Sequence, residues 1–277
     1  MKKKILITGA TGFVGSQVLK NLLARNNDVY AVVRKTKKNL LKKNYPNLNL
    51  IATNDLFAES SEWWRKKCKD IHTIIHVAWY VEPGKYLNSS KNINCLKGSL
   101  NMAQGAIKAG VKKFVGIGTC FEYDLSLGKL SINSMLKPST IYSATKASLY
   151  TTLSQLFINN STEFAWCRLF YLYGEGDDKR RFVGYLHKQL SEGRLVKLGS
   201  GKQIRDFLNV SEVGRIIYNI ALGDKQGPIN ICSGDPITVR QMAQKIADQY
   251  NKRHLLKFGA RPDNLIDPQR VVGVPNF

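Results

Sequence analysis

The sequence lacks any apolar run of about 18 residues, the length that a membrane-spanning helix needs. It has only five cysteines, scattered without a CxxC pair, and its four histidines show no zinc-ligand spacing. We therefore expect no metal site, free thiols and a reducing compartment, the cytoplasm. The basic start at residues 1–4 precedes only three apolar residues, too few for a signal peptide, and this segment predicts a buried strand.

Acidic residues are scarce: 20 Asp and Glu against 42 Lys and Arg leave a formal net charge of +22. Such a charge can attract nucleic acid, an anionic membrane or anionic small molecules. The lysines are spread along the chain, densest over residues 34–43, and no nucleic-acid-binding motif accompanies them. We interpret most of the excess as a solvated surface and part of it as attraction for phosphorylated ligands, so we expect neither a nucleic-acid nor a membrane partner.

Short apolar runs alternate with helical patterns, in the order typical of an α/β fold with a doubly wound parallel sheet. The expected strands are residues 4–8, 28–33, 48–52, 71–78, 113–118 and 164–170. One expected helix starts at residue 12, and four others span residues 92–109, 141–159, 210–222 and 238–250. Gly110 is a candidate helix C-cap, and Thr238 with Gln241 forms a candidate capping box. After about residue 173 the elements shorten, which indicates a smaller C-terminal α/β substrate domain.

A glycine-rich segment, GATGFVG at residues 9–15, lies between the first expected strand and the first expected helix. Glycines there permit a tight turn, close approach of the backbone to a pyrophosphate, and close packing of helix on strand. The helix N-terminus adds free N–H groups and the positive end of a dipole. We therefore expect a dinucleotide, bound by Gly9, Thr11, Gly12, Phe13, Val14 and Gly15.

The end of the second expected strand indicates which dinucleotide is bound. NAD enzymes usually have an Asp or Glu there, which accepts a hydrogen bond from the ribose 2′-hydroxyl. This chain has Arg34 and Lys35 instead, and two cations suit a 2′-phosphate. We predict NADPH as the cofactor. The alternative is an ordinary basic loop, because lysines continue to Lys43.

Tyr142 and Lys146 are four residues apart on an expected helix, which puts phenol and ammonium on one face. A nearby cation favours the phenolate and lowers the tyrosine pKa, so the phenol becomes a usable acid or base near neutral pH. Taken alone, this spacing is common by chance. Thr119, however, ends the fifth expected strand, and its hydroxyl could share a substrate oxygen with Tyr142.

Together, GATGFVG, IIHVA, GTCFEY and YSATK resemble, in order and spacing, the motifs of the extended short-chain dehydrogenase/reductases, the NAD-dependent epimerase/dehydratase family. The resemblance implies a Rossmann-type cofactor domain over residues 1–172 and a sugar-nucleotide domain over 173–277. It further implies a catalytic triad, adenine contacts, a nicotinamide contact and a ribose contact from Lys146. The residues are Thr119, Tyr142 and Lys146 for the triad, Asp55 and Leu56 for the adenine, and Ala78 beside the nicotinamide.

The C-terminal half extends the resemblance to enzymes of nucleotide sugars. Residues 168–174, RLFYLYG, are similar to their RxxNxYG signature, and residues 205–207 are similar to an RDF motif whose arginine meets the substrate diphosphate. Tyr171 replaces the usual asparagine, which puts the phosphate contact of that loop in doubt. The expected substrate residues are Trp79, Thr119, Cys120, Tyr171, Arg180, Arg181, Arg205 and Arg261. For the arginines other than Arg205, an exposed surface residue is the alternative.

The reaction is narrowed by a departure from the family pattern. Dehydratases of this group carry an Asp-Glu pair directly after the catalytic threonine, and here those positions are Cys120 and Phe121. Phenylalanine transfers no protons, so 4,6-dehydration is disfavoured. Residues 117–124, IGTCFEYD, resemble the reductases of nucleotide-activated 4-keto-6-deoxyhexoses, the CDP-abequose synthase and dTDP-fucose-forming types. The prediction is therefore NADPH-dependent 4-keto reduction, in the synthesis of surface polysaccharide sugars.

Alternatives stay open at this point. A 4-epimerase of the same fold is one, and a non-catalytic NADP(H)-binding sensor is another, although such proteins typically lose the tyrosine or the lysine. The Cys120 thiol is either a second acid or base or a small buried apolar residue. Family members often dimerise through two helices of each subunit, so we expect a homodimer formed by residues 92–109 and 141–159.

Overall fold

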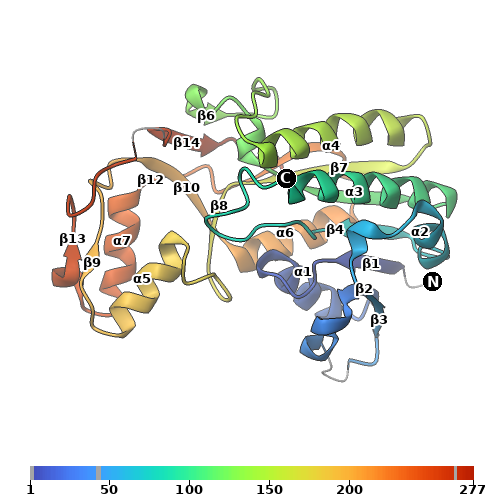
Figure 1. Ribbon diagram of the computed structural model, residues 1–277, viewed down its shortest axis with the longest axis horizontal. Helices are drawn as coiled ribbons and strands as arrows, with labels where there is room; N and C mark the ends of the chain where they lie inside the picture. The colour runs from blue at the N-terminus through green and yellow to red at the C-terminus, as the bar shows by residue number, and fades with distance from the viewer. Residues whose placement is uncertain (1–2, 42–44, 265–266) are drawn as a thin grey trace.

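A parallel sheet of seven strands forms the centre of the computed structural model, which describes residues 3–41, 45–264 and 267–277 (Figure 1). Lys42 and Lys43 of the lysine-rich stretch lie outside the described residues. The strand order is β11-β7-β5-β4-β1-β2-β3. The strands are β1 (Lys4–Thr8), β2 (Asp28–Arg34), β3 (Leu48–Thr53), β4 (Thr73–His76), β5 (Lys113–Thr119), β7 (Glu163–Leu169) and β11 (Gly227–Ile231). The order reverses beside β1, so the predicted doubly wound Rossmann-type sheet is confirmed.

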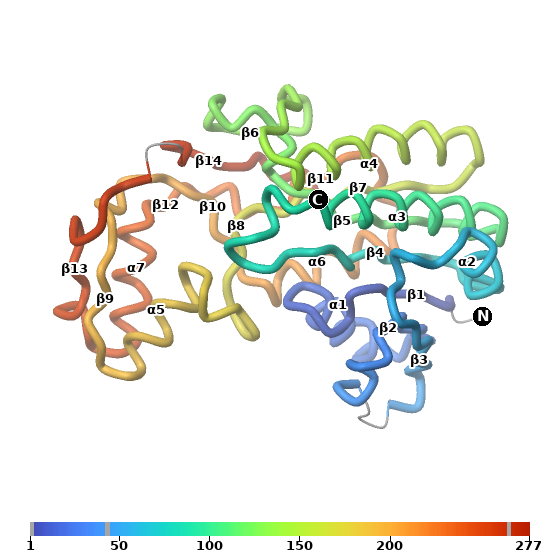
Figure 2. Tube along the Cα trace, viewed as in Figure 1, coloured from blue at the N-terminus to red at the C-terminus, as the bar shows by residue number. Residues whose placement is uncertain are grey.

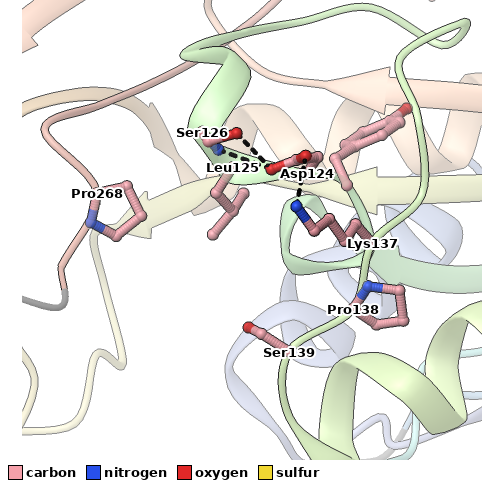
Figure 3. Close-up of a pocket in the computed structure, with 8 residues that line it drawn as sticks. Asp124, Leu125, Ser126, Lys137, Pro138, Ser139 and Pro268 are labelled. Carbon is pink, nitrogen blue, oxygen red and sulfur yellow. Dashed lines mark hydrogen bonds and ion pairs between the residues drawn. The ribbon is translucent and has the colours of Figure 1, made fainter.

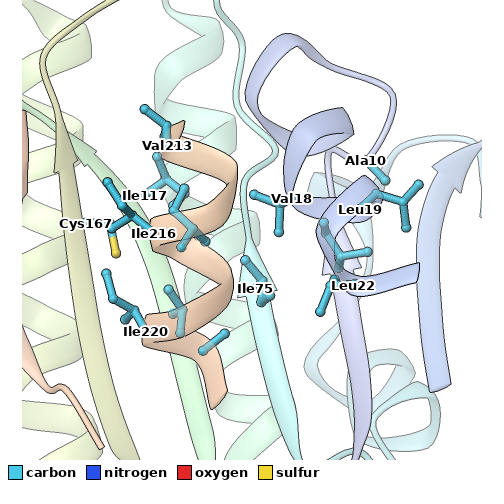
Figure 4. Close-up of a cluster of buried hydrophobic side chains, with 14 of the residues drawn as sticks. Ala10, Val18, Leu19, Leu22, Ile75, Ile117, Cys167, Val213, Ile216 and Ile220 are labelled. Carbon is cyan, nitrogen blue, oxygen red and sulfur yellow. The ribbon is translucent and has the colours of Figure 1, made fainter. Parts of the chain in front are cut away.

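Helices cover both faces of this sheet, and each face has its own apolar core. On one face α1 (Phe13–Ala24) and α6 (Val210–Leu222) pack side by side; on the other lie α2 (Ser61–Lys67), α3 (Lys91–Lys108) and α4 (Ile141–Ile158). Figure 4 shows the first core, in which side chains of α1 and α6 meet those of the strands. Successive strand residues point to opposite faces, so a strand buried on both sides reads as one continuous apolar run.

The predicted strand over residues 71–78 is shorter in the structure. Only β4, Thr73–His76, pairs with its neighbours. Beyond His76 the chain leaves the ladder, because the Ala78 N–H donates to the Thr8 hydroxyl at 3.2 Å instead of to a strand. The predicted helix ends agree closely: Gly110 follows α3 with φ +76°, and Thr238 and Gln241 form the capping box of α7 (Val239–Asp248).

A second, smaller lobe contains a five-stranded sheet, as far as the described residues show. Its order is β12-β10-β14-β6, with β8 paired to β10. The strands are β6 (Lys129–Leu130), β8 (Tyr171–Tyr173), β10 (Ile204–Asn209), β12 (Pro236–Thr238) and β14 (Arg270–Gly273). Helices α5 (Phe182–Ser191) and α7, with the pair β9 (Val196–Lys197) and β13 (Leu256–Lys257), enclose a separate core. In Figure 2 this lobe lies at the left, beside the carboxyl ends of the large sheet.

The chain crosses between the lobes more than once, which differs from the predicted division at residues 172 and 173. β11 pairs with β7 in the large sheet, and α6 packs against α1, although both were expected in the C-terminal domain. Conversely, β6 pairs with β14 in the small sheet. The physical reason is long-range strand pairing: β11 fills the open edge beside β7, and α6 buries Val213 and Ile216 on the large sheet. Among the described residues, no helix is both long and apolar enough to span a membrane.

The carboxylate of Asp206 joins these crossings. It is fully buried and accepts hydrogen bonds from the Ser233 N–H and hydroxyl, both at 2.7 Å. The Gly234 N–H at 2.9 Å and the Gly273 N–H at 3.2 Å complete the set. One side chain of β10 thus holds the segment that follows β11 and the strand β14.

Replacing Asp206 by asparagine should destabilise the protein by about 2–4 kcal/mol, because an amide offers one acceptor oxygen and turns a donor towards buried N–H groups. Urea unfolding of Asp206→Asn would measure the loss. Asp235→Asn is the matched control, because Asp235 is exposed and its side chain has no partner among the described residues. Equal unfolding midpoints for the two variants would contradict the role of Asp206.

Candidate active site

The glycine-rich segment turns tightly between β1 and α1. Gly9 has φ +73°, and the Gly12 N–H donates to the Gly9 carbonyl at 2.9 Å. A Cβ on Gly15 would lie 2.1 Å from the Gly9 oxygen, and one on Gly9 would lie 2.7 Å from the Ala78 nitrogen. Gly12 caps α1 without a side-chain hydrogen bond, so the first N–H groups of the helix are left for an anion. These residues fit the pyrophosphate of a dinucleotide.

The predicted adenine and 2′-phosphate residues lie farther along the same edge of the sheet. Arg34 ends β2 and Lys35 begins the 3₁₀ segment η1 (Lys35–Leu41); both are exposed, and neither side chain bonds to another described residue. Asp55 caps η2 (Leu56–Ala58) by accepting from the Phe57 N–H at 3.0 Å, and Leu56 is buried beneath. The two cations are therefore available to an anionic ligand.

Tyr142 lies in the first turn of α4, beside Thr119. Thr140 and Ser143 form the capping box that starts this helix, which fixes the direction of the Tyr142 side chain into the protein. Tyr142 and Lys146 are 9% and 3% exposed. The Thr119 hydroxyl, at the end of β5, lies close enough to the Tyr142 phenol to lower its pKa. The structure thus brings together the two hydroxyls that the sequence analysis assigned to one substrate oxygen.

The Lys146 ammonium is bonded to the backbone of β5. Its Nζ donates to the Ile117 carbonyl at 2.6 Å and lies 3.7 Å from the centre of the Trp79 ring. Burial lowers the pKa of Lys146 to about 7. Burial is also the main reason that the pKa of Tyr142 is raised, with the nearby phenol of Tyr86 raising it further. The prediction that Lys146 lowers the pKa of Tyr142 is therefore wrong, because the effect of burial on the phenol outweighs any effect of the ammonium.

A buried ion pair supports Thr119 from below. The carboxylate of Glu122 accepts from the Thr119 N–H at 2.8 Å, from the Trp166 indole at 3.1 Å and from Arg168 Nε at 2.7 Å. Arg168 is only 1% exposed and stacks between two tyrosine rings. Arg168, the first residue of the RLFYLYG segment, therefore acts within the fold and not on a ligand. Glu122 holds the backbone of Thr119 in place.

Cys120 and Tyr171 pack in one apolar cluster beside Thr119. Burial raises the pKa of both groups, and the Cys120 thiol raises the pKa of Tyr171 further. A thiol kept protonated in this way is a poor base, so the structure favours the small buried residue for Cys120. The guanidinium of Arg205 lies 5.2 Å from the centre of the Tyr171 ring and pairs with the Asp267 carboxylate at 2.6 Å.

The other predicted arginines are more dispersed. Arg180 is exposed and pairs with Asp178 at 2.7 Å. The guanidinium of Arg181 lies over the Phe13 ring at 5.4 Å, so it borders the glycine-rich segment. Arg261 stacks on an aromatic ring of α5 in the small lobe, at 5.4 Å. Of the three, only Arg181 is placed against a predicted cofactor residue.

Two residues of the site escaped the sequence analysis. The Tyr86 ring meets the Tyr142 ring edge to face, with centres 4.8 Å apart. Asn92, fully buried at the start of α3, binds the indole of Trp79. No sequence signal marks either residue, because Tyr86 lies in a segment without a periodic pattern and Asn92 is one of several polar residues at the start of α3. Among the described residues, no three His, Cys, Asp or Glu side chains gather as metal ligands would.

A cavity of about 470 Å³ lies between residues 123–126, residues 137–139 and Pro268 (Figure 3). Figure 3 shows Leu125 and Pro268 on opposite sides of it and the Lys137 side chain directed to Asp124, which it meets at 3.3 Å. The described residues that line it include no member of the predicted triad. Because residues 137–139 lead directly into α4, this cavity borders the site without containing Tyr142 and Lys146, which we call the dyad.

The lowered pKa of Lys146 has a consequence for stability. Between pH 7 and 10.5 the unfolded lysine binds a proton that the folded one does not, so burying Lys146 costs most at pH 7 and below, and the cost fades as the pH rises towards 10.5. Lys146→Met should therefore unfold with a free energy about 2–4 kcal/mol above that of the wild type near pH 7, a difference that closes at high pH.

Urea unfolding of both proteins from pH 6.5 to 10 would test this expectation. Lys97→Met serves as the control, because Lys97 is an exposed lysine on α3. A Lys146→Met curve that runs parallel to that of the wild type over the whole range would refute the shift.

Comparisons with known proteins agree with this architecture. The chain is 23% identical to a dTDP-6-deoxy-L-talose 4-dehydrogenase (NAD(+)) of Aggregatibacter actinomycetemcomitans, over 97% of this chain and 98% of that protein. It is 27% identical to a CDP-abequose synthase of Salmonella typhimurium, over 82% and 73% of the two chains. Its fold matches a UDP-N-acetylglucosamine 4-epimerase of Methanobrevibacter ruminantium with a TM-score of 0.87 and 21% identity, over 99% and 90%. Residues 5–232 match the NAD dependent epimerase/dehydratase family, and the chain belongs to this family.

Proposed function

We propose that this chain is an NADPH-dependent reductase of the 4-keto group of a nucleotide-activated 4-keto-6-deoxyhexose, in the synthesis of surface polysaccharide sugars. The observation that carries the proposal is the buried pair of hydroxyls, Thr119 and Tyr142, with a lysine one turn further along α4 and a protonated thiol in place of an acid beside them. The relatives support the substrate class, since one is named for 4-dehydrogenation of a dTDP-6-deoxy sugar and one for synthesis of CDP-abequose.

The chain itself supplies the proton. A nicotinamide dinucleotide, when bound, supplies the hydride that adds to C4. Tyr142 stays protonated at neutral pH, because burial raises its pKa, and its proton passes to the C4 oxygen as that oxygen gains charge. The Thr119 hydroxyl donates a hydrogen bond to the same oxygen, and Lys146 stabilises the tyrosinate that remains. Ketone, hydride and proton together give the alcohol, and solvent restores the proton to Tyr142.

The cofactor and substrate residues follow from the same arrangement. Arg34 and Lys35 would hold a 2′-phosphate. Support for NADPH comes from this pair and not from the relatives, because one of them is named for NAD(+). Arg205 would meet the substrate diphosphate, with Tyr171 against the sugar. Asp267 pairs with the guanidinium of Arg205, so a diphosphate bound there would compete with that carboxylate.

We also propose a homodimer in the cytoplasm, formed through α3 and α4. Ile93, Ile141 and Ile158 are 44%, 37% and 74% exposed, and burial of these apolar side chains against the second copy would favour the dimer. The large lobe would carry the cofactor and the small lobe the sugar nucleotide.

The alternative is a 4-epimerase of nucleotide sugars, for which the same dyad suffices. One observation favours it: the solved structure that this fold matches with a TM-score of 0.87 is a UDP-N-acetylglucosamine 4-epimerase. An epimerase keeps its cofactor through purification and consumes no net NADPH. Absorbance of the reduced nicotinamide therefore separates the two reactions when dTDP- and CDP-4-keto-6-deoxyglucose are supplied in turn.

Tyr142→Phe should lower turnover in that assay about 10²–10⁴-fold, the usual contribution of a positioned acid, with little loss of NADPH affinity. Tyr45→Phe is the control, because Tyr45 is 45% exposed and its side chain makes no hydrogen bond or ring contact with another described residue. Unimpaired turnover in Tyr142→Phe would remove Tyr142 from the mechanism.

Replacing the two cations at the end of β2, Arg34 and Lys35, by glutamates should change the cofactor preference. The double variant Arg34→Glu, Lys35→Glu should bind NADPH about 10–100-fold more weakly and NADH almost unchanged, because charge-assisted hydrogen bonds to the 2′-phosphate are lost. Lys37→Glu, Lys38→Glu makes the same change in charge a few residues further along η1. Fluorescence titration measures both affinities. If both double variants lose NADPH affinity equally, the preference comes from general charge and not from Arg34 and Lys35.

A further inference from the structure

The segment over residues 79–90 leads from β4 to α3 and brings two aromatic rings against the dyad. The Trp79 ring centre lies 3.7 Å from Lys146 Nζ. The Tyr86 ring lies against Tyr142, with centres 4.8 Å apart and planes at 85°. The Tyr142 N–H also donates to the Leu87 carbonyl at 2.8 Å, which fastens the segment to the first turn of α4. We call the rings of Trp79 and Tyr86 the aromatic wall.

One side chain fixes both parts of this wall. Asn92 is fully buried in the first turn of α3. Its Oδ1 accepts from Trp79 Nε1 at 2.8 Å, and its Nδ2 donates to the carbonyls of Tyr86 at 2.6 Å and Ser89 at 2.9 Å. All three hydrogen bonds of the Asn92 side chain therefore go to residues 79–90.

We propose that Asn92 is a positioning residue, whose amide holds Trp79 over Lys146 and Tyr86 against Tyr142 so that the wall keeps water from the dyad. The wall stands on geometry alone; its effect on turnover rests on the proposed function. An indole face partly replaces the lost hydration of an ammonium, and an edge-to-face contact holds a phenol without competing for its proton. Excluding water strengthens the remaining electrostatic interactions of the dyad.

The charges around the dyad agree with a dry site. Burial is the main cause of the lowered pKa of Lys146 and of the raised pKa of Tyr142. The groups that act on Lys146 from neighbouring elements are Glu122, after β5, and Cys95, on α3, and both raise its pKa. Because these effects oppose the observed direction, exclusion of water dominates, and the wall is the part of the site that can be opened by substitution.

Asn92→Leu tests the proposal, because leucine has a similar size, adds no charge and makes none of the three hydrogen bonds. Asn94→Leu is the matched control, since Asn94 is exposed on the same helix and its side chain has no partner among the described residues. The emission of Trp79 is obtained by subtracting the spectrum of the same protein carrying Trp79→Phe. Both variants are measured without ligand.

In the wild type, Trp79 emission should resist quenching by acrylamide and should titrate with Lys146, near pH 7. In Asn92→Leu, quenching should rise several-fold and the midpoint should move to higher pH, because water readmitted to the site favours the ammonium. Turnover should fall about 10–100-fold with NADPH affinity kept, as expected for a misplaced catalytic group. Asn94→Leu should match the wild type in every respect.

Quenching and midpoint that stay at their wild-type values in Asn92→Leu would overturn the proposal, as would unchanged turnover in an active enzyme whose wall has opened. These two fluorescence readings need no substrate. If they shift as expected in a chain that reduces no 4-keto sugar, the wall stands and the proposed reaction fails.

A second pair of variants covers the case in which Asn92→Leu does not fold. Tyr86 lies in a partly exposed segment, so Tyr86→Leu should fold and should raise the midpoint of the Trp79 titration. Tyr86→Phe, which keeps the ring, should restore the wild-type midpoint and most of the lost turnover. A phenylalanine variant as impaired as the leucine variant would assign Tyr86 to a hydroxyl contact with substrate and would overturn its role as a wall.

Discussion

The buried ion pair of Glu122 and Arg168 is the interaction on which the candidate site depends. It lies between the ends of β5 and β7, at the point where the large sheet gives way to the small lobe. Charges this deep are expensive to bury, and hydrogen bonds to their other atoms offset part of that cost. Glu122 gains such bonds by accepting from the Thr119 N–H and from Trp166 as well as from Arg168. The buried carboxylate thus fixes the backbone of Thr119 through the hydrogen bond from its N–H.

Burial away from water also determines the protonation states of Tyr142 and Lys146, which lie near this ion pair. Burial favours the neutral form of both groups, so it raises the pKa of Tyr142 and lowers that of Lys146 to about 7. Proton donation requires a protonated phenol. A lysine with a pKa near 7 changes its protonation state when the charges around it change. Binding of an anionic nucleotide beside it would favour the ammonium. The charge that the proposed reaction needs would therefore develop as the ligand arrives.

Much of the fold could be predicted because its determinants are local. Continuous apolar runs marked the buried strands, helical spacing marked α4 and α6, and the glycines of residues 9–15 marked the turn that a Cβ on Gly15 would block. The failures involve contacts distant in sequence. Pairing of β11 with β7 moved the domain boundary, and nothing local to either strand announces the other. The direction of Lys146 likewise depends on the Ile117 carbonyl and on Trp79, which helical spacing cannot show.

Two sets of residues have different roles in the site. Those predicted by family resemblance carry the proposed chemistry, and those found only in the structure shape its surroundings. Thr119, Tyr142 and Lys146 follow a pattern shared by enzymes with different reactions, so they define a class of chemistry and not a substrate. The segment that carries Trp79 and Tyr86 has no periodic signal, and it is held by the amide of Asn92 and by the Tyr142 N–H. A surface fixed by a few hydrogen bonds can change its shape through few substitutions while the dyad stays intact. The selectivity of this chain is therefore to be sought in the wall and in the small lobe opposite it.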